Sequence, residues 1–407
     1  DLVQNASRKK APTEKFITKF ARYYTPAVVI SAALLAFLPP LFIPNATFSE
    51  WIYRALIFLV ISCPCALVVS IPLGFFGGIG GASKNGILIK GSNFLEALND
   101  VHTVVFDKTG TLTKGVFKVT QIIPTGNLSK ETLLEYAALA ESYSTHPIAL
   151  SILKAYEKNI DKTRISMVEE IPGHGVKVTI DGKEVLVGNK KLMLEYNIHI
   201  DANTSGTLVY IAVDGNYEGL IVISDEIKED SAKAIAALKT LGIKKTVMLT
   251  GDHHSTAKEI ANQLNLDEVH SQLLPHEKVE KLESIQNQML SKQKLIFAGD
   301  GINDAPVLAR ADIGIAMGGV GSDAAIEAAD IVLMTDEPSK IVSAIKIARK
   351  TRRIVWENII FALGVKIFVL ALGAFGFATM WAAVFSDVGV ALIAVLNAMR
   401  VLNAKIN

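Results

Sequence analysis

The chain has 407 residues, of which 41 are Lys or Arg and 40 are Asp or Glu. The formal net charge of +1 gives no reason to expect nucleic-acid binding. The two cysteines share one apolar segment, which argues against a disulfide framework and favours a thiolate site. The length predicts more than one domain, and the polar, basic start, Asp1 to Lys15, shows no cleavable signal peptide.

Four segments are apolar and long enough to cross a bilayer, at about residues 25–43, 51–80, 354–377 and 380–402. They form two close pairs on either side of a long polar region, which favours transmembrane helices over buried core helices. Lys and Arg gather before the first segment, after the second and before the third, and the two short connecting loops contain none. This pattern predicts that both termini and the middle region are cytoplasmic.

In the middle region, short apolar runs alternate with amphipathic helical patterns, which is typical of a parallel, doubly wound α/β sheet. Expected strands are 103–106, 246–249, 295–298, 313–316 and 331–334, and expected helices are 230–241, 255–264 and 275–288. We expect an inserted α+β module at 115–224. The predicted domains are two membrane regions, 1–90 and 341–407, and a sheet domain made of 91–114 and 225–340.

The run Asp107-Lys108-Thr109-Gly110-Thr111-Leu112-Thr113 follows the apolar strand pattern at 101–106. A carboxylate at the carboxyl end of such a strand lies where open α/β sheets bind ligands, and it suits a nucleophile facing a phosphoryl donor. Acidic loops also follow two later strands, at Asp252 and at Asp300 to Asp304. The heptapeptide, with these loops in order behind it, resembles the phosphorylation motif of the P-type ATPases.

The resemblance implies a role for each matching position. Asp107 would become the aspartyl phosphate, and Asp300 would bind Mg²⁺ beside Asp107 and the main-chain carbonyl of Thr109. Thr250 and Lys278 would contact the phosphoryl group of ATP. The remaining catalytic positions are Lys108, Gly251, Asp252, Asn303 and Asp304, although Asp252 on its own also suits a solvated turn.

A soluble phosphatase of the haloacid dehalogenase type is the rival interpretation of this sheet domain. Such phosphatases usually carry a second Asp two residues after the nucleophile, as general acid and base. Thr109 occupies that position here. Because no local acid would activate water, we expect the acyl phosphate to persist, as a pump requires.

The inserted module resembles the nucleotide-binding domain of heavy-metal P-type ATPases. That resemblance implies an ATP pocket, and its matching residues are Glu141, His146, Gly173, Gly175, Gly188 and Asn189. Glycines let the backbone approach a ligand closely. The alternatives are a turn histidine for His146 and a solvated helix face for Glu141.

Cys63-Pro64-Cys65 lies inside the second apolar segment. Pro64 interrupts helical hydrogen bonding, and thiolates are ligands for soft metal ions. Asp387 in the fourth segment is a candidate third ligand, and Lys366 in the third a candidate counterion that helps to expel the metal. Lys366 alternatively extends to the membrane interface. Two thiolates with a carboxylate favour a divalent ion over copper(I), in agreement with the zinc, cadmium and lead branch of these ATPases.

The resemblance therefore predicts an ATP-driven exporter of Zn²⁺, Cd²⁺ or Pb²⁺, in the plasma (inner) membrane of a bacterium. No Thr-Gly-Glu loop of an actuator domain occurs in the sequence, so we expect a missing N-terminal part with that domain and further helices. As it stands, the chain should form the aspartyl phosphate but turn over poorly. The alternatives are a copper(I) exporter, a membrane-tethered phosphatase and a non-enzymatic metal sensor.

Overall fold

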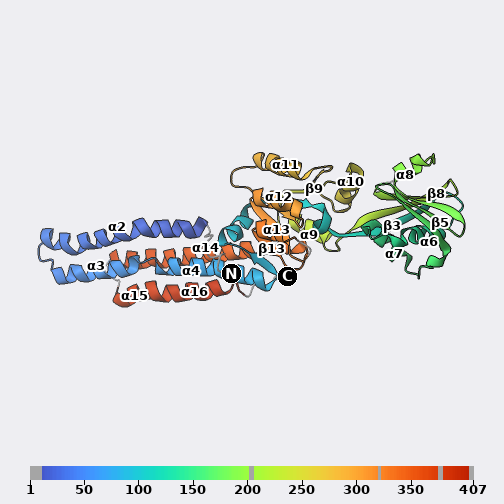
Figure 1. Ribbon diagram of the computed structural model, residues 1–407. Coiled ribbons are helices and arrows are strands. Elements are labelled where there is room, and N and C mark those ends of the chain that lie inside the picture. The colour runs from blue at the N-terminus through green and yellow to red at the C-terminus, as the bar shows by residue number, and fades with distance from the viewer. Residues whose placement is uncertain (1–11, 201–205, 320–321, 375–378, 403–407) are drawn as a thin grey trace. The chain divides into compact units, whose positions relative to one another are not determined.

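A computed structural model describes residues 12–200, 206–319, 322–374 and 379–402 (Figure 1). Its contacts divide the chain into two units. The first unit takes in 1–105, 233–246 and 279–407, and the second takes in 106–232 and 247–278. Arg8, Lys9 and Lys10, which contribute to the charge pattern before the first apolar segment, lie outside the described residues.

The first unit contains a bundle of long helices (Figure 1). Its members are α2 (Pro12–Phe42), α3 (Phe48–Ser62), α4 (Cys65–Lys84), α14 (Ser339–Ala374), α15 (Met380–Val384) and α16 (Val390–Met399). They supply four helical spans of sufficient length and hydropathy to cross a membrane, at Arg22–Phe42, Phe48–Lys84, Ser339–Leu372 and Met380–Met399. Large apolar side chains such as Phe37, Ile367 and Leu392 are more than half exposed on the bundle, as a lipid-facing surface requires.

Two of the four spans are irregular near the same level of the bundle. Pro64 has no N–H to donate, and the helix ends at Ser62 and restarts at Cys65. In the fourth span, one π-helical turn, η6 (Phe385–Gly389), lies between α15 and α16 and carries Asp387. Such π turns inside α-helices are frequent at functional sites because they redirect side chains.

The first unit also holds strands in the order β1-β13-β12-β11. Strands β11 (Lys294–Gly299), β12 (Ile313–Met317) and β13 (Ile331–Leu333) are parallel, and β1 (Ile87–Ile89) pairs antiparallel with β13. Nearly all their residues are buried, as expected for parallel strands covered on both faces. The shorter helices are α5 (Ser92–Ala97), η1 (Leu98–Asp100), α9 (Ser231–Thr240), η5 (Ile302–Asp304), α12 (Ala305–Arg310) and α13 (Asp323–Ala328).

Strands β2 (Val101–Asp107) and β9 (Lys245–Leu249) and helices α9 and α11 (Pro275–Asn287) each run from one unit into the other. In the second unit, the last residues of β9 pair in parallel with β10 (Glu268–His270), and α10 (His254–Gln263) connects the two strands. The strands and helices predicted for the sheet domain are all present, with boundaries shifted by at most two residues.

The rest of the second unit is a six-stranded antiparallel sheet in the order β3-β8-β7-β6-β5-β4. Alternate residues of its strands face opposite ways: Val185 and Val187 pack with α6 and α7, and Leu186 packs with α8. The strands are β3 (Thr113–Pro124), β4 (Ile165–Ile171), β5 (Gly175–Ile180), β6 (Lys183–Gly188), β7 (Thr207–Val213) and β8 (Asn216–Ile227). The helices are α6 (Lys130–Ala140), η3 (Glu141–Tyr143), α7 (Pro147–Tyr156), η4 (Lys162–Arg164) and α8 (Lys190–Glu195).

Candidate functional site

Asp107, the last residue of β2, is buried and forms an ion pair with a lysine from α11. The Nζ of Lys278 donates to Oδ1 of Asp107 at 2.5 Å, and the two side chains are 11% and 8% exposed. The hydrogen bond restricts the carboxylate to one orientation and places a positive charge beside it. The predicted nucleophile and the predicted phosphoryl-binding lysine are therefore in direct contact.

The loop that follows Asp107, η2 (Lys108–Leu112), is held by residues that the sequence analysis did not identify. Gly110 has a φ of 71°, which only glycine adopts without strain. Its carbonyl accepts a hydrogen bond from the Nζ of Lys228, and the carbonyl of Leu112 accepts from Ser231 Oγ at 2.8 Å. Lys228 and Ser231 directly follow β8, where the chain returns from the inserted sheet.

Asp225 is a second functional candidate that the sequence analysis missed. Its side chain is 4% exposed, its Oδ2 accepts from the hydroxyl of Thr113, and it lies 3.7 Å from Nζ of Lys108. Burial raises the pKa of this carboxyl, while Thr113 and Lys108 oppose the shift. The available signal was its place in the sequence, because Asp225 comes shortly after the apolar run 220–223, where the predicted insertion ends.

Lys108 also pairs with Asp252, whose Oδ2 lies 2.5 Å from its Nζ. Asp252 is therefore an ion-pair partner here, whereas the alternative was a solvated turn acid. The Asp252 N–H donates to Oγ1 of the buried Thr250 at 3.2 Å, which ties these two predicted residues together across Gly251.

A cavity of about 200 Å³ adjoins this group within the second unit. Its lining includes Lys108, Thr109 and Asp252 from the loops and Phe117 and Asp225 from the inserted sheet. The side chain of Thr109 is exposed, and the cavity is thus lined by three of the predicted catalytic residues.

Asp300, Asn303 and Asp304 lie in the first unit, directly after β11. Asp304 is 2% exposed, and its Oδ2 accepts from the Gly301 N–H at 3.4 Å. The Asp300 carbonyl accepts from the Ser322 N–H at 2.9 Å. Because Asp107 belongs to the other unit, the magnesium site that would join it to Asp300 stays a prediction.

Glu141 in the inserted module is buried, which excludes the solvated helix face as its environment. It is 8% exposed, and burial raises its pKa to about 7, with Glu170 adding to the shift and Ser144 opposing it. His146 is exposed and caps α7, accepting the Ile148 N–H on Nδ1 at 3.3 Å. This arrangement assigns the ring proton of neutral His146 to Nε2.

The glycines of the predicted nucleotide pocket differ in their surroundings. Gly175 faces Gly188 across β5 and β6, and a Cβ on Gly175 would lie 2.3 Å from the carbonyl oxygen of Val187. A side chain cannot fit there, so this pair lets two strands approach closely. Gly173 has open space around it and a φ of 73°, and its carbonyl accepts from Asn189 Nδ2 at 2.8 Å. Asn189 therefore fixes the shape of the Gly173 turn.

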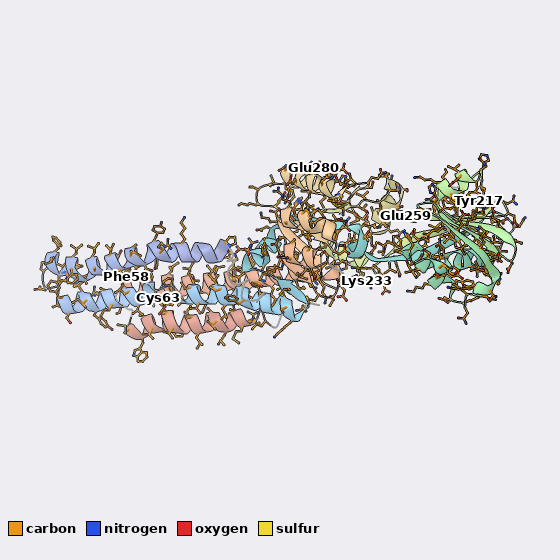
Figure 2. All side chains as sticks on the ribbon, viewed as in Figure 1. Phe58, Cys63, Tyr217, Lys233, Glu259 and Glu280 are labelled. Atoms are coloured by element: carbon orange, nitrogen blue, oxygen red, sulfur yellow. A yellow bond between two sulfur atoms is a disulfide. The ribbon has the colours of Figure 1, made fainter. Side chains whose placement is uncertain are left out.

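Cys63 lies near the middle of the helical bundle (Figure 2). The expectation of two free thiols is wrong for this structure, in which Cys63 and Cys65 form a disulfide. The physical reason is the break at Pro64: Cys63 (φ −64°, ψ 123°) lies outside helical geometry, so the side chains of Cys63 and Cys65 are not held at the spacing of a continuous helix. Their Cα atoms are 5.5 Å apart, within disulfide range.

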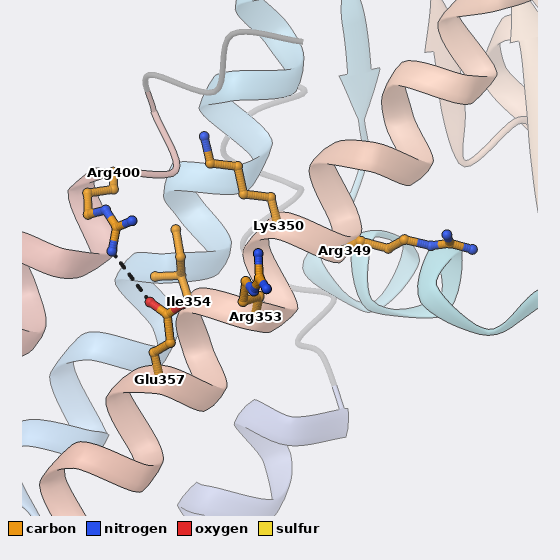
Figure 3. Close-up of a pocket in the computed structure, with 6 residues that line it drawn as sticks. All are labelled: Arg349, Lys350, Arg353, Ile354, Glu357 and Arg400. Atoms are coloured by element: carbon orange, nitrogen blue, oxygen red, sulfur yellow. Dashed lines mark hydrogen bonds and ion pairs between the residues drawn. The ribbon is translucent and has the colours of Figure 1, made fainter. Parts of the chain in front are cut away.

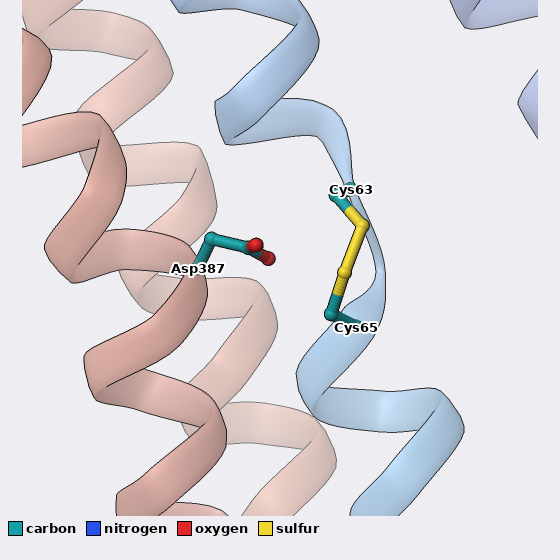
Figure 4. Close-up of side chains that lie close together, drawn as sticks. All are labelled: Cys63, Cys65 and Asp387. Atoms are coloured by element: carbon teal, nitrogen blue, oxygen red, sulfur yellow. A yellow bond between two sulfur atoms is a disulfide. The ribbon is translucent and has the colours of Figure 1, made fainter.

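The Asp387 carboxylate points toward these two sulfur atoms (Figure 4). One ligand atom from each of Cys63, Cys65 and Asp387 falls in a group whose members lie within 4.8 Å of one another. The Oδ1 of Asp387 and the Oγ of Ser386 are buried without a hydrogen bond. The three predicted metal ligands are therefore brought together from two helical spans, with a carboxylate oxygen available for a cation.

Lys366 is 6% exposed and does not extend to the interface. Its Nζ donates to the carbonyl of Ile61 at 2.9 Å and to that of Cys63, two acceptors that the break at Pro64 deprives of helical partners. The same Nζ lies 3.8 Å from Oδ1 of Asp387. A single lysine thus stabilises the broken helix and places its charge beside the candidate ligand.

Comparison with known proteins points to one class for the whole chain. Residues 101–312 match the family model described as haloacid dehalogenase-like hydrolase. The chain is 64% identical over 406 residues to the cadmium, zinc and cobalt-transporting ATPase of Bacillus subtilis (strain 168). That alignment covers 100% of this chain and 58% of the relative, so the chain spans about three-fifths of the relative's length.

Two solved structures resemble the fold. A zinc-transporting PIB-type ATPase in the E2.Pi state matches with a TM-score of 0.85 and 37% identity, covering 98% of this chain and 66% of that one. The catalytic domain of the CPx-ATPase CopB-B, described in connection with nucleotide binding, matches with a TM-score of 0.51 and 32% identity, covering 65% of this chain and 97% of that one.

Proposed function

We propose that this chain, which belongs to the metal-transporting P-type ATPases with a haloacid dehalogenase-like phosphorylation domain, is the catalytic and ion-conducting core of an exporter of divalent soft metal ions. The observation that carries the proposal is the Asp387 carboxylate beside the sulfurs of Cys63 and Cys65, inside apolar helical spans. A phosphatase leaves this buried ligand set without a role, and a non-enzymatic sensor leaves the acidic cluster of Asp300 and Asp304 without one.

Asp107 is proposed to attack the terminal phosphate of ATP, forming a bond between a carboxylate oxygen and phosphorus and releasing ADP. Lys278 orients the carboxylate and stabilises the charge on the phosphate oxygens. Bound Mg²⁺ would neutralise further phosphate charge, and the oxygen donors of Asp107, Thr109 and Asp300 suit it. The exposed Thr109 carries no acid to activate water, so the acyl phosphate persists.

The inserted sheet is proposed to bind the adenosine part of ATP near Glu141, His146 and Gly173. Two features support this placement: a buried carboxyl with a raised pKa, and an open glycine turn held by Asn189. Gly175 and Gly188 support the pocket indirectly, because they let β5 and β6 approach closely.

The transported ion is proposed to bind the two sulfurs and Asp387 after the disulfide is reduced. A dithiol reductant supplies two electrons and two protons, yielding two thiols and the oxidised reductant. Two thiolates with one carboxylate favour Zn²⁺ or Cd²⁺ over copper(I). Because the Bacillus subtilis relative is named for cobalt as well, Co²⁺ belongs among the candidate ions, together with Pb²⁺.

We place the basic ends of the spans and the strands and helices of the middle region, residues 91–340, on the cytoplasmic side of a bacterial plasma membrane. The support is the gathering of cations such as Lys84, Arg349 and Lys350 where the apolar spans end. Phosphorylation of Asp107 would then open the metal site outward. A further N-terminal part with an actuator domain would complete the turnover.

The test is phosphorylation of the full-length parent protein by labelled ATP, with and without a dithiol reductant, across Zn²⁺, Cd²⁺, Pb²⁺, Co²⁺ and copper(I). We expect an acid-stable, hydroxylamine-sensitive phosphoenzyme that depends on a divalent ion and on the reductant. Stimulation by copper(I) alone would replace the ion assignment. Rapid hydrolysis of phosphate monoesters without a stable phosphoenzyme would support the phosphatase instead.

A further inference from the structure

A basic cavity lies where α14 and α16 leave the apolar part of the bundle (Figure 3). Its volume is about 440 Å³, and it is lined by Arg349, Lys350, Arg353, Ile354, Glu357 and Arg400. Four of these lining residues are cationic against one carboxylate, an excess of three positive charges. We call this group the basic pocket.

The one acid of the basic pocket is already neutralised. Glu357 on α14 lies 3.4 Å from the guanidinium of Arg400 at the end of α16, and Arg400 also donates to Oδ1 of Asn397 at 2.6 Å. The contact between Glu357 and Arg400 connects the two helices across one side of the pocket (Figure 3). The charge of Glu357 is therefore unavailable to the other cations.

The remaining cations have no acidic partner within the part of the chain that the structure describes. Neither Arg349, Lys350 nor Arg353 forms an ion pair with a described residue. The adjacent Arg352 provides the contrast, because it lies 3.1 Å from a carboxylate oxygen of Asp100. Three unpaired cations around one cavity favour a phosphate or a similar anion over a metal ion or a neutral ligand.

The position of the basic pocket indicates where its anion comes from. Just beyond it on α14, Trp356 is 53% exposed and Ile360 is 66% exposed. Tryptophan gathers at the membrane–water interface, and exposed aliphatic side chains face acyl chains. A ligand with a phosphate in the pocket and hydrocarbon along Ile360 would satisfy both surfaces.

We propose that the basic pocket binds the headgroup phosphate of an anionic glycerophospholipid from the cytoplasmic leaflet. The inference rests on the membrane orientation proposed above, but on no step of ATP hydrolysis or metal binding. Basic pockets between transmembrane helices at the cytoplasmic surface attract such headgroups. The bound lipid would balance the charge of α14 at the point where this helix joins the phosphorylation domain.

The test compares lipid retention by two variants of the full-length parent protein. Both are reconstituted in nanodiscs that mix phosphatidylglycerol with phosphatidylcholine, and the retained lipids are counted by native mass spectrometry. K350Q/R353Q removes two pocket cations, and we expect roughly tenfold less retained phosphatidylglycerol. K19Q/R22Q removes the same charge from exposed positions on α2, and we expect little change.

Further arms identify the ligand and guard against misfolding. The charge-retaining variant K350R/R353K should keep the lipid, and inorganic phosphate added to the wild type should not displace it. Metal-stimulated phosphoenzyme formation serves as a check of folding that is independent of the pocket. If the wild type forms no phosphoenzyme, that result contradicts the proposed transport function and not the lipid assignment.

Three results would overturn the lipid assignment. Equal loss in the two charge-removing variants indicates general surface attraction. Unchanged retention in K350Q/R353Q indicates that another part of the full-length protein covers the pocket. Displacement by inorganic phosphate indicates a site for a free anion.

Discussion

Lys278 with Asp107, beside the predicted phosphorylation loop, and Lys366 with Asp387, inside the helical bundle, are both buried lysine–carboxylate pairs, and they differ in geometry. Lys278 donates directly to Asp107 at 2.5 Å. Lys366 lies 3.8 Å from Asp387 and donates instead to the main-chain carbonyls of Ile61 and Cys63. The first lysine donates a hydrogen bond directly to its carboxylate, whereas the second donates to the main chain of the broken helix.

The difference shows how a lysine–aspartate pair can suit either phosphoryl transfer or metal binding, depending on where the lysine donates its hydrogen bonds. In its proposed role, Asp107 would need a positive charge that stays with it when its oxygen takes up a phosphoryl group. As a proposed metal ligand, Asp387 would need a positive charge that balances it without occupying the oxygen that binds the metal. Lys366 donates to the carbonyls of Ile61 and Cys63, which the break at Pro64 leaves free to accept. Oδ1 of Asp387 is therefore left without a hydrogen bond and can serve as a ligand.

The largest expected effect is at the phosphorylation loop. Asp107→Asn keeps the size of the side chain but removes the nucleophilic oxygen, so we expect metal-stimulated ATPase activity to fall by about 10⁴-fold or more. Acid-quenched labelling with ATP should detect no phosphoenzyme. Metal binding to the reduced protein, measured separately by equilibrium dialysis, should change little. Persistent labelling in this variant would assign the phosphate to another residue.

At the membrane site, Asp387→Asn should reduce the affinity for Zn²⁺ by about 10- to 100-fold, the range found when the support of a metal site is removed. The amide is a weaker ligand and carries no charge to balance Lys366. Equilibrium dialysis of the reduced protein measures this affinity. Ser386→Ala, which removes the neighbouring buried hydroxyl, is the matched control. Equal affinity in Asp387→Asn and the wild type would remove Asp387 from the ligand set.

Lys366→Met should affect release more than binding. It removes the charge near Asp387 and leaves the carbonyls of Ile61 and Cys63 without their donor. We expect about tenfold slower metal-stimulated turnover, with the metal retained more tightly, because opposing charge no longer favours its departure. Lys366→Arg keeps the charge and should retain more activity. Full transport by Lys366→Met would contradict the counterion role.

Much of this arrangement follows from sequence, because apolar periodicity and strand-end carboxylates are local signals. The strand before Asp107, the break at Pro64 and the four spans could all be predicted. The pairing of Lys108 with Asp225 and Asp252 could not, since it depends on loops more than 100 residues apart. The donation from Lys366 to the broken helix could not be predicted either, because its acceptors are main-chain carbonyls and every residue has one.

The disulfide was missed for a different reason. Low cysteine content argues against a disulfide framework, but it does not exclude one bond between two cysteines that a proline break turns to the same side. The basic pocket also escaped notice. Arg349, Lys350 and Arg353 belong to the positive-inside pattern, whereas Arg400 falls inside the predicted fourth segment, and only the contact of α14 with α16 groups Arg353 with Arg400.

The smallest expected effect concerns Glu141, a buried carboxyl for which burial dominates the pKa shift. Since its pKa is raised from 4.5 to about 7, the folded protein holds this proton more tightly than the unfolded chain does. The contribution of Glu141 to stability therefore falls as the pH rises from about 4.5 to about 7 and is constant above that. Above pH 7 the group is ionised in a buried site beside Glu170, where its charge also opposes the phosphates of a nearby nucleotide.

We therefore expect ATP affinity to decrease about threefold between pH 6 and pH 8, a modest change because solvent screens the repulsion between this carboxylate and the phosphates. Glu141→Gln, which mimics the protonated form, should remove that part of the pH dependence and bind ATP at pH 8 as the wild type does at pH 6. Titration calorimetry with a non-hydrolysable ATP analogue measures both. Glu170→Gln is the matched control, because it should lower the pKa of Glu141 and move the transition to lower pH without abolishing it. An unchanged pH profile in Glu141→Gln would show that ionisation of Glu141 does not affect ATP binding. Glu141 would then be only a buried acid at the end of α6.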